Sequence, residues 1–362
     1  MRAARAAEVS SKGDALVVEG KRIALFSERD PSKIPWAAAA GGGEGGIYVL
    51  ECSGAFTHAS AAAAHLSAGA RKVIISAPAD THTLLMGVNH RSYDPQAHHV
   101  VSNASCTTNC LAPVAKVVAD AFGIEEALMT TVHAVTASQK PVDAPAGKKD
   151  ARAGRSALCN IIPASTGAAV AVTKVLPELA GKMTGMAFRV PVADVSVVDL
   201  TVRTSRPASM DDVARALREA AAGPLRGILA VTDEHVVSSD FIGERHSAVV
   251  DLRASMALND RFFKLIAWRA AGSSGRRASY GLRRAETRTA QVRQRGRVRD
   301  ALRGPRQVHG AVRLGRRKLE APLEGRGAGV AATRGTCVRA NDTPQAKART
   351  LGDATSARSC GW

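Results

Sequence analysis

The stretch Ser102-Asn-Ala-Ser-Cys-Thr-Thr-Asn-Cys-Leu-Ala-Pro113 marks the boundary between two patterns in this chain. It follows a short apolar run and precedes a longer one that extends to about Phe122, which predicts a helix that begins near Cys106. The free N–H groups and the dipole of a helix N-terminus stabilise a thiolate. Ser105 and Thr107 add hydroxyl groups at this anion-friendly position. The residues alone leave two interpretations of Cys106, a nucleophile or a buried structural cysteine behind a polar cap.

A strand–helix–strand pattern lies before this stretch. Apolar runs at residues 47–51 and 72–76 predict buried strands, and the Ala-rich segment 57–67 predicts a helix between them. Thr57 is the expected N-cap of that helix, and Gly69 is its expected end. A βαβ unit of this length indicates a parallel sheet, although one unit is less than a complete doubly wound sheet.

Strand-like runs follow one another after the helix at Cys106. They are residues 127–135, 183–192, 195–203, 247–252 and 262–268. Strands in succession favour an antiparallel sheet, and the predicted helices at about 166–176 and 209–222 would cover one face of it. We therefore expect an incomplete α/β domain at residues 1–103 and an α+β domain at residues 104–268.

The net charge of +18 is concentrated in the last quarter of the chain. Residues 269–362 hold 22 Lys and Arg against 6 Asp and Glu, whereas the residues before them hold 28 against 26. This Arg- and Gly-rich tail has few large apolar side chains, so we expect it to be largely disordered. Nucleic acid is an expected partner only through this tail, where one Tyr and one Trp offer little base stacking.

Several classes of protein are disfavoured by composition. No apolar run approaches the roughly 20 residues of a membrane helix, and the first residues lack the apolar stretch of a signal peptide. The six cysteines show no disulfide-scaffold spacing, which favours a reducing, cytoplasmic compartment. Cys106 and Cys110 have no third and fourth ligand at zinc spacing, so no metal is expected.

The stretch at residues 102–113 resembles the active-site signature of the glyceraldehyde-3-phosphate dehydrogenase family. Other segments resemble that family in the same order and at near-family spacing. They are residues 28–34, 73–78, 130–136, 160–167, 185–191, 195–201 and 257–262. The resemblance covers roughly residues 9–268. It implies an NAD-dependent, phosphorylating aldehyde dehydrogenase of glycolysis, built from a truncated Rossmann-like NAD-binding domain and a catalytic domain, and assembled as a homotetramer.

The resemblance also implies roles for single residues. Cys106 adds to the aldehyde and ends as a thioester that phosphate cleaves, while His133 activates the thiol and takes the proton during hydride transfer. Without the resemblance, a strand histidine such as His133 is more often a satisfied core residue. The implied binding residues are Thr136 and Arg189 for the phosphate of glyceraldehyde 3-phosphate, Ser105, Thr107, Thr166 and Gly167 for inorganic phosphate, and Arg29 and Ser76 as two minor NAD contacts.

The resemblance breaks at both ends. The run Gly41-Gly-Gly-Glu-Gly-Gly46 fits G-x-G-x-x-G as a string but precedes a strand instead of following one, so residues 37–46 are expected to be a flexible insertion. The acidic residue that grips the adenosine ribose is missing. After Trp268, the family's nicotinamide-binding Asn and final helix are not found. One alternative is a catalytically impaired relative that acts at most as a binding protein; another is a mis-spliced or frame-shifted gene product.

Overall fold

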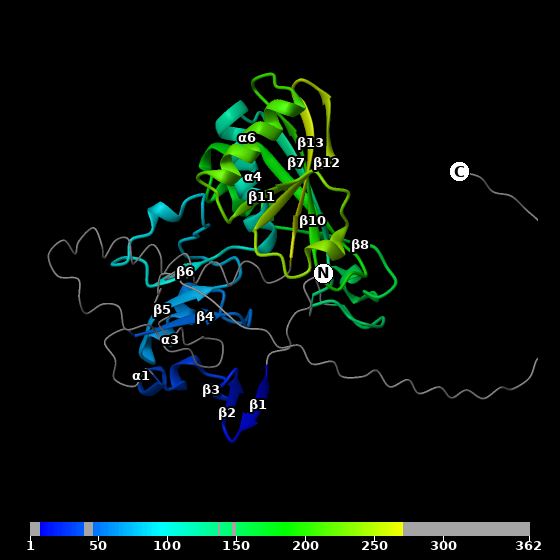
Figure 1. Cartoon of the computed structure of the whole chain (residues 1–362). Helices are drawn as coiled ribbons and strands as arrows, with labels where there is room; N and C mark the ends of the chain where they lie inside the picture. Colours follow the sequence, from blue (N-terminus) through cyan, green and yellow to red (C-terminus); the bar gives the residue numbers. More distant parts are fainter. Residues whose placement is uncertain (1–7, 40–45, 137, 147–149, 271–362) are drawn as a thin grey trace, which may run out of the picture. The chain divides into compact units, whose positions relative to one another are not determined.

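A computed structural model of the chain describes residues 8–39, 46–136, 138–146 and 150–270 (Figure 1). The expected disordered tail, apart from its first two residues, lies outside this part of the chain. Three sheets are formed by the described residues: one of three strands at the start, one parallel sheet of three strands, and one mixed sheet of seven strands. No helix of the described residues is long and apolar enough to cross a membrane.

The first sheet is an antiparallel meander that the sequence pattern did not indicate. It consists of β1 (Val9–Lys12), β2 (Ala15–Val18) and β3 (Lys21–Ala24). Glu19 and Gly20 form the two-residue turn between β2 and β3, and both have positive φ, at 50° and 72°. Two central residues with positive φ match the twist of a hairpin, which explains the glycine at this position.

The parallel sheet confirms the predicted strand–helix–strand unit. β4 (Ile47–Glu51) pairs with β5 (Ala70–Ile75), and β5 pairs with β6 (Val100–Ser102), each in parallel. The predicted helix is two short helices, α2 (Ala59–Ala62) and α3 (Ala64–Ser67).

The N-cap expected at Thr57 is wrong, because His58 occupies that position without a side-chain cap bond. The carboxylate of Asp80 accepts the free N–H of Ala59 instead, at 2.6 Å. The helix is thus capped by a residue 21 positions away along the chain. A local sequence pattern does not predict such a distant cap. Before β4, α1 (Trp36–Ala39) includes the first three residues of the expected insertion, whose residues 40–45 are outside the described ranges.

The seven-stranded sheet carries all the strands expected after Cys106. Its order is β11-β12-β13-β10-β7-β9-β8. The strands are β7 (Glu126–His133), β8 (Ile162–Ser165), β9 (Met183–Arg189), β10 (Ser196–Arg203), β11 (Leu229–Thr232), β12 (Ala248–Asn259) and β13 (Phe262–Arg269).

The seven-stranded sheet is mixed, whereas succession of strands favoured an antiparallel one. Four of its six pairings are antiparallel, but β7 with β9 and β11 with β12 are parallel. Parallel neighbours need a long crossover, and the chain between β7 and β9 supplies one that contains β8 and a helix.

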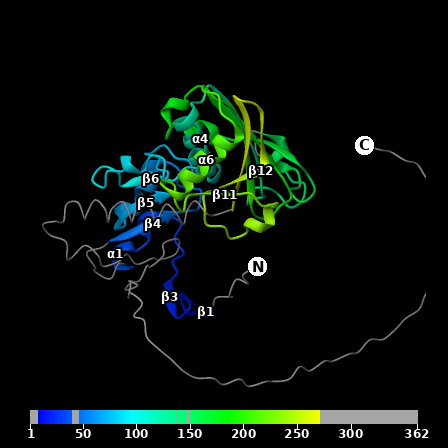
Figure 2. The same ribbon diagram turned by 45° about the horizontal axis from the view of Figure 1, so that its top comes forward.

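Three helices pack against this sheet, and Figures 1 and 2 show two of them, α4 and α6, on one of its faces. The three helices are α4 (Cys106–Phe122), α5 (Ala168–Thr173) and α6 (Met210–Ala222), close to the predicted ranges. α4 packs on β10, β12 and β13, α5 packs on β9, and α6 packs beside α4 on β11 and β12. The core between the layers includes Leu111, Met129, Leu200 and Leu217. The sheet therefore holds α4 firmly, and with it the helix start at Cys106.

Short 3-10 turns complete the described elements. They are η1 (Pro31–Lys33), η2 (His90–Ser92), η3 (Ala151–Gly154), η4 (Pro177–Leu179) and η5 (Ser238–Phe241).

Candidate active site

The ends of four neighbouring strands form one row of side chains across the seven-stranded sheet. β7 and β9 place His133 opposite Arg189. β10 and β13 place Ser196 opposite Arg269, and β10 lies between β13 and β7. Side chains alternate between the two faces of a strand, and every second residue of β7 and of β13 is buried. This alternation includes the last residues of the two strands, His133 and Arg269, so both side chains lie on the helix-covered face. One face of the sheet thus presents a histidine and two arginines together.

The start of α4 meets this row. Cys106 is the first residue of the helix, as predicted, and Ser105 is its N-cap, with its hydroxyl accepting the N–H of Thr108 at 3.0 Å. The Asn109 amide donates to the carbonyl of Ser105 at 2.9 Å, which fixes the first turn. The preceding Ala104 has φ of 53°, an uncommon conformation for a residue with a Cβ. The chain therefore turns sharply into the helix at the cysteine.

Cys106 and His133 form a close pair. The thiol Sγ lies 3.7 Å from Nε2 of His133, and Nδ1 of the same ring lies 2.7 Å from the carbonyl of Ala134. Cys106 is partly exposed, whereas His133 is buried. When Nδ1–H donates to Ala134, the lone pair of Nε2 is directed to the thiol, which is the geometry that a general base requires.

Burial lowers the pKa of His133 to about 4. The positive charges of Arg269 and Arg189 lower this pKa further, whereas the hydrogen bond to Ala134 acts in the opposite direction. The imidazole is therefore neutral at physiological pH and able to take a proton. Nη1 of Arg189 lies 2.6 Å from Nδ1 and 3.3 Å from the carbonyl of Ala134. A guanidinium only donates, so Arg189 binds Nδ1 in one tautomer and the carbonyl in the other.

Cys110, one helical turn on, contrasts with Cys106. Its thiol is fully buried and donates to the carbonyl of Ala267 at 3.8 Å. Burial raises the pKa of Cys110 to about 12, so its thiol is protonated. Cys110 is thus a packing residue between α4 and β13.

The other residues predicted for phosphate binding lie at three places. Ser105 and Thr107 are on the first turn of α4, although the Ser105 hydroxyl already caps the helix. Thr136 is exposed three residues after His133, where its hydroxyl donates to Gln139 at 2.8 Å. Thr166 and Gly167 precede α5, where the Thr166 hydroxyl accepts the N–H of Ala168 at 3.2 Å. No hydrogen bond within the described ranges links Thr136, Thr166 or Gly167 to Cys106 or His133.

Arg269 lies on the same row as His133, although its Arg-rich surroundings in the sequence predicted that it belongs to the tail. It ends β13, is 1% exposed, and donates from Nη2 to the Thr107 hydroxyl at 3.2 Å. The alternation of Phe263, Leu265 and Ala267 as buried residues extends to position 269. Continuing this alternation by one residue in the sequence would have predicted that Arg269 lies on the helix-covered face.

The described residues fit one half of a dinucleotide better than the other. β4, β5 and β6 end on the same edge, and ligands of parallel sheets bind at such carboxyl ends. Ser76 follows β5 there, and β6 ends four residues before Cys106. Arg29, by contrast, is an exposed residue before η1.

The adenosine half lacks its partners in the described part of the chain. Glu51 is the acidic residue at the end of β4, but it is buried and bound to His65 at 3.0 Å and to Ser53. Although burial acts to raise it, these hydrogen bonds hold the pKa of Glu51 below its usual value. His65 in turn accepts from the indole N–H of Trp36 at 3.1 Å. Glu51 is therefore a structural carboxylate. Within the described ranges, no G-x-G-x-x-G run follows a strand to bind a pyrophosphate.

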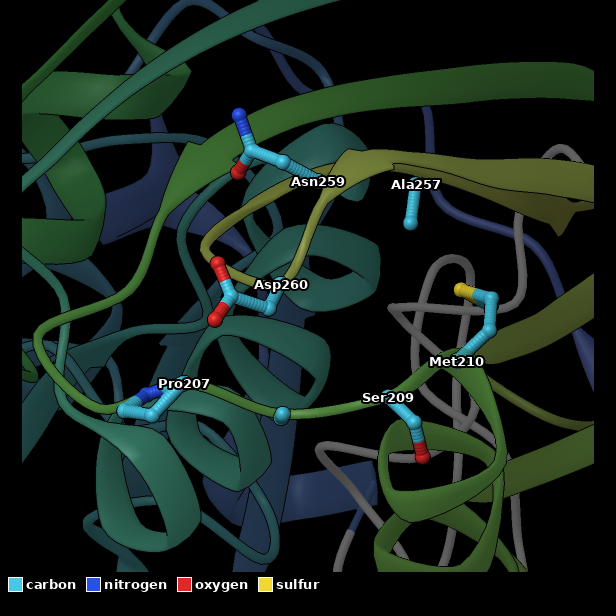
Figure 3. Close-up of a pocket in the computed structure, with 7 residues that line it drawn as sticks. Pro207, Ser209, Met210, Ala257, Asn259 and Asp260 are labelled. Carbon is cyan, nitrogen blue, oxygen red and sulfur yellow. The ribbon is translucent and has the colours of Figure 1, made fainter.

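A separate pocket of about 450 Å³ lies at the start of α6 (Figure 3). Its lining includes Pro207, Ser209, Met210, Ala257 and Asp260. The Ser209 hydroxyl, which would be its natural anion donor, is engaged with Asp212 in a capping box. The pocket shares no residue with the row at Cys106, so it is not part of the candidate active site.

The α/β fold and the close Cys106–His133 pair describe a class of protein whose thiol is suited to nucleophilic chemistry. The pattern of one family, described as glyceraldehyde 3-phosphate dehydrogenase, C-terminal domain, matches residues 105–271. The chain is 58% identical over 266 residues to glyceraldehyde-3-phosphate dehydrogenase 2 of Caenorhabditis briggsae, covering 72% of this chain and 76% of the relative.

Two further relatives are similar to the same extent. Glyceraldehyde-3-phosphate dehydrogenase 2 of Danio rerio is 56% identical over a region that covers 72% of this chain and 76% of the length of that relative. The cytosolic glyceraldehyde-3-phosphate dehydrogenase of Chlamydomonas reinhardtii is 56% identical over 72% of this chain and 75% of its own. This chain therefore belongs to the glyceraldehyde-3-phosphate dehydrogenase family, as the resemblance predicted.

The low pKa of His133 predicts a pH-dependent loss of stability. The unfolded ring has an ordinary pKa of 6.5 and the folded ring one of about 4, so the unfolded state binds more protons between these values. Stability therefore falls as the pH is lowered from about 6.5 to 4, by an amount of the order of 3 kcal/mol from this group. Urea unfolding of the chain and of His133→Asn across this range should show a steeper fall in the wild type. Parallel pH profiles would contradict the assignment.

Proposed function

We propose that this chain oxidises glyceraldehyde 3-phosphate to an acyl phosphate with NAD and inorganic phosphate. The observation that carries the proposal is the 3.7 Å contact between Cys106 Sγ and His133 Nε2 at the start of α4, in a chain 58% identical to a named glyceraldehyde-3-phosphate dehydrogenase. A thiol that faces a neutral imidazole at a helix N-terminus is suited to covalent attack on a carbonyl carbon.

The residues of the chain account for the proton and bond changes. His133 Nε2 takes the thiol proton, and Cys106 Sγ bonds to the aldehyde carbon, whose oxygen becomes an alkoxide near the N–H groups of α4. A bound NAD would supply the acceptor for the hydride of that carbon, so that the alkoxide collapses to the carbonyl of a thioester on Cys106. Phosphate oxygen then bonds to the carbonyl carbon, and the C–S bond breaks to return the thiolate. Water is a competing nucleophile, so a phosphate pocket favours the productive step.

Two anion positions are proposed for this chemistry. Thr136 and Arg189 bind the phosphate of the substrate, which requires Thr136 to release Gln139. Ser105, Thr107, Thr166 and Gly167 surround the inorganic phosphate. The helix N-terminus at Cys106 and the guanidinium of Arg189 support this assignment, because both favour phosphate oxygens.

Assembly as a homotetramer is supported by apolar side chains on the described surface. Several large ones on β7, β9 and β12 are exposed: Leu128, Met186, Met256 and Leu258. Exposed apolar side chains gathered on a sheet favour association with another subunit. A cytosolic location is proposed from the relative of Chlamydomonas reinhardtii, which is named cytosolic.

The incomplete dinucleotide site predicts weak NAD binding. Because the described residues provide neither a G-x-G-x-x-G turn after a strand nor a free acidic ribose partner, we expect NAD to bind about 10–100-fold more weakly than to the relative of Caenorhabditis briggsae. Tryptophan fluorescence during NAD titration of both proteins measures the two affinities. Equal affinities would show that residues outside the described ranges complete the site.

The function is tested by the phosphate dependence of turnover. The full chain is incubated with glyceraldehyde 3-phosphate and saturating NAD, with and without inorganic phosphate, and NADH is followed. We expect NADH to form repeatedly only with phosphate and to stop after one equivalent per Cys106 without it. Rapid alkylation of Cys106 without any NADH would overturn the proposal and favour a thiol-adduct-forming binding protein, which the incomplete NAD site supports.

A further inference from the structure

Arg269 is a buried cation with unused hydrogen-bond donors. Its Nη2 donates to the Thr107 hydroxyl at 3.2 Å, while Nε and Nη1 are buried and have no acceptor in the described part of the chain. Nε of Arg189, on the same row of the sheet, is also buried without an acceptor among the described residues. No ion pair of the described residues joins either guanidinium to a carboxylate. Among the described residues, two guanidinium groups thus lack a carboxylate partner, and three of their nitrogen atoms lack an acceptor.

This arrangement is unfavourable unless an anion completes it. A guanidinium stays charged when it is buried, because its pKa is too high for it to lose a proton. Removing its N–H groups from water without an acceptor costs free energy, and removing the charge costs more. A ligand that brings negative charge and several acceptor oxygens would offset both costs.

The neighbours of Arg269 indicate which anion fits. Thr107 is on the first turn of α4, whose free N–H groups attract oxyanions. Because the Thr107 oxygen accepts from Arg269, its own hydroxyl hydrogen is available to a ligand. The donors beside the start of α4 are thus the Arg269 guanidinium, the Thr107 hydroxyl and the helix N–H groups, which suit a tetrahedral, multiply charged oxyanion better than a halide or a planar carboxylate.

We propose that Arg269 binds and positions the inorganic phosphate at the start of α4, beside Cys106. This inference rests on the proposed function, and it adds a residue of β13 to the phosphate pocket. Arg269 holds the Thr107 hydroxyl in place and directs its remaining donors to the phosphate. The phosphate ester of the substrate stays with Thr136 and Arg189, so the two anions are held by different residues.

The proposal is tested by phosphate binding to three full-length variants. Arg269→Met removes the charge but keeps an unbranched side chain, Arg269→Lys keeps the charge, and Arg253→Met is the matched control, since Arg253 is an exposed residue of β12. The melting temperature and the alkylation rate of Cys106 are measured against inorganic phosphate, with chloride at matched ionic strength. Glycerol 3-phosphate serves as an unreactive phosphate ester in a second titration.

We expect phosphate to raise the melting temperature and slow alkylation in the wild type and in Arg253→Met. In Arg269→Met, the phosphate Kd should rise at least about tenfold, while Arg269→Lys lies between the two. Without phosphate, Arg269→Met should melt at the same temperature as the wild type or higher, because an unpaired buried charge is removed. Glycerol 3-phosphate should protect the wild type and Arg269→Met equally.

Three outcomes would overturn the inference. The first is an unchanged phosphate affinity in Arg269→Met. The second is loss of glycerol 3-phosphate binding in that variant as well, which would make Arg269 a general anion residue. The third is a wild type that does not bind phosphate at all. Repeated NADH formation in Arg269→Met at high phosphate would still uphold the proposed function, so the two conclusions fail separately.

Discussion

Cys106→Ser should abolish turnover, with NADH formation at least about 10⁴-fold slower than in the wild type. A serine hydroxyl at this position is hardly ionised at neutral pH and is a far weaker nucleophile than a thiol. The substitution changes one atom, and the partly exposed position at the start of α4 accepts either side chain. The fold and the melting temperature should therefore stay close to those of the wild type. Steady-state and single-turnover assays with matched melting curves measure the effect.

The exposed cysteines provide controls for this substitution. Cys52 and Cys159 are exposed thiols of the described chain. Cys52→Ser and Cys159→Ser should each keep turnover within about twofold of the wild type, because surface substitutions away from a site have small effects. Substantial NADH formation by Cys106→Ser would exclude a thioester mechanism.

Mass spectrometry after brief treatment with iodoacetamide separates the cysteines further. Cys106 should be modified first because His133 contacts its thiol. Cys110 should stay unmodified in the folded protein, because its thiol is fully buried and its pKa is raised to about 12.

The sequence predicted the elements whose pattern is local and regular. The apolar run after Cys106 gave α4, and the alternating runs gave β7, β9, β10 and β13, since burial on one face imposes a period on the residues. The meander β1–β3 was missed because its strands are four residues long and β1 is exposed, as Val9 at 59% shows. The parallel pairs of the large sheet were missed because strand order depends on crossovers, which leave no local pattern.

The site was predictable in its residue types and less so in its contacts. The resemblance supplied Cys106, His133 and Arg189, and strand register explains why the last two are neighbours. It did not show that the Ser105 hydroxyl is a helix cap, or that Thr136 is bound to Gln139. Both facts depend on side-chain competition within a turn, where several acceptors lie at similar distances.

Arg269 was missed for a different reason. It follows Trp268, where the resemblance read from the sequence ended, and it opens an Arg-rich segment, so composition assigned it to the tail, although the family match extends to residue 271. The structure instead continues β13 by one residue, and alternation directs that residue to the buried face. Composition averages over many residues, so it places a segment boundary only approximately. The face on which a single strand residue lies is set by the register of the strand.

His133→Asn should slow both the alkylation of Cys106 and turnover by about 10²–10⁴-fold at neutral pH. Asparagine is similar in size and keeps polar atoms for the Ala134 carbonyl, but it does not take a proton. Because the pKa of His133 is about 4, the wild-type base is neutral from about pH 5 upward. The wild type should therefore lose no activity through protonation of His133 in that range. Alkylation by iodoacetamide and NADH formation, followed from about pH 5 upward, measure both rates.

His246→Asn is the matched control for that variant. His246 is partly buried and bound to Glu244 at 2.7 Å, and it shares no hydrogen bond with the row at Cys106 in the described chain. The His246→Asn variant should be alkylated by iodoacetamide at Cys106 at the wild-type rate across the whole pH range. If His133→Asn also reacted at that rate, the 3.7 Å contact would be a packing contact.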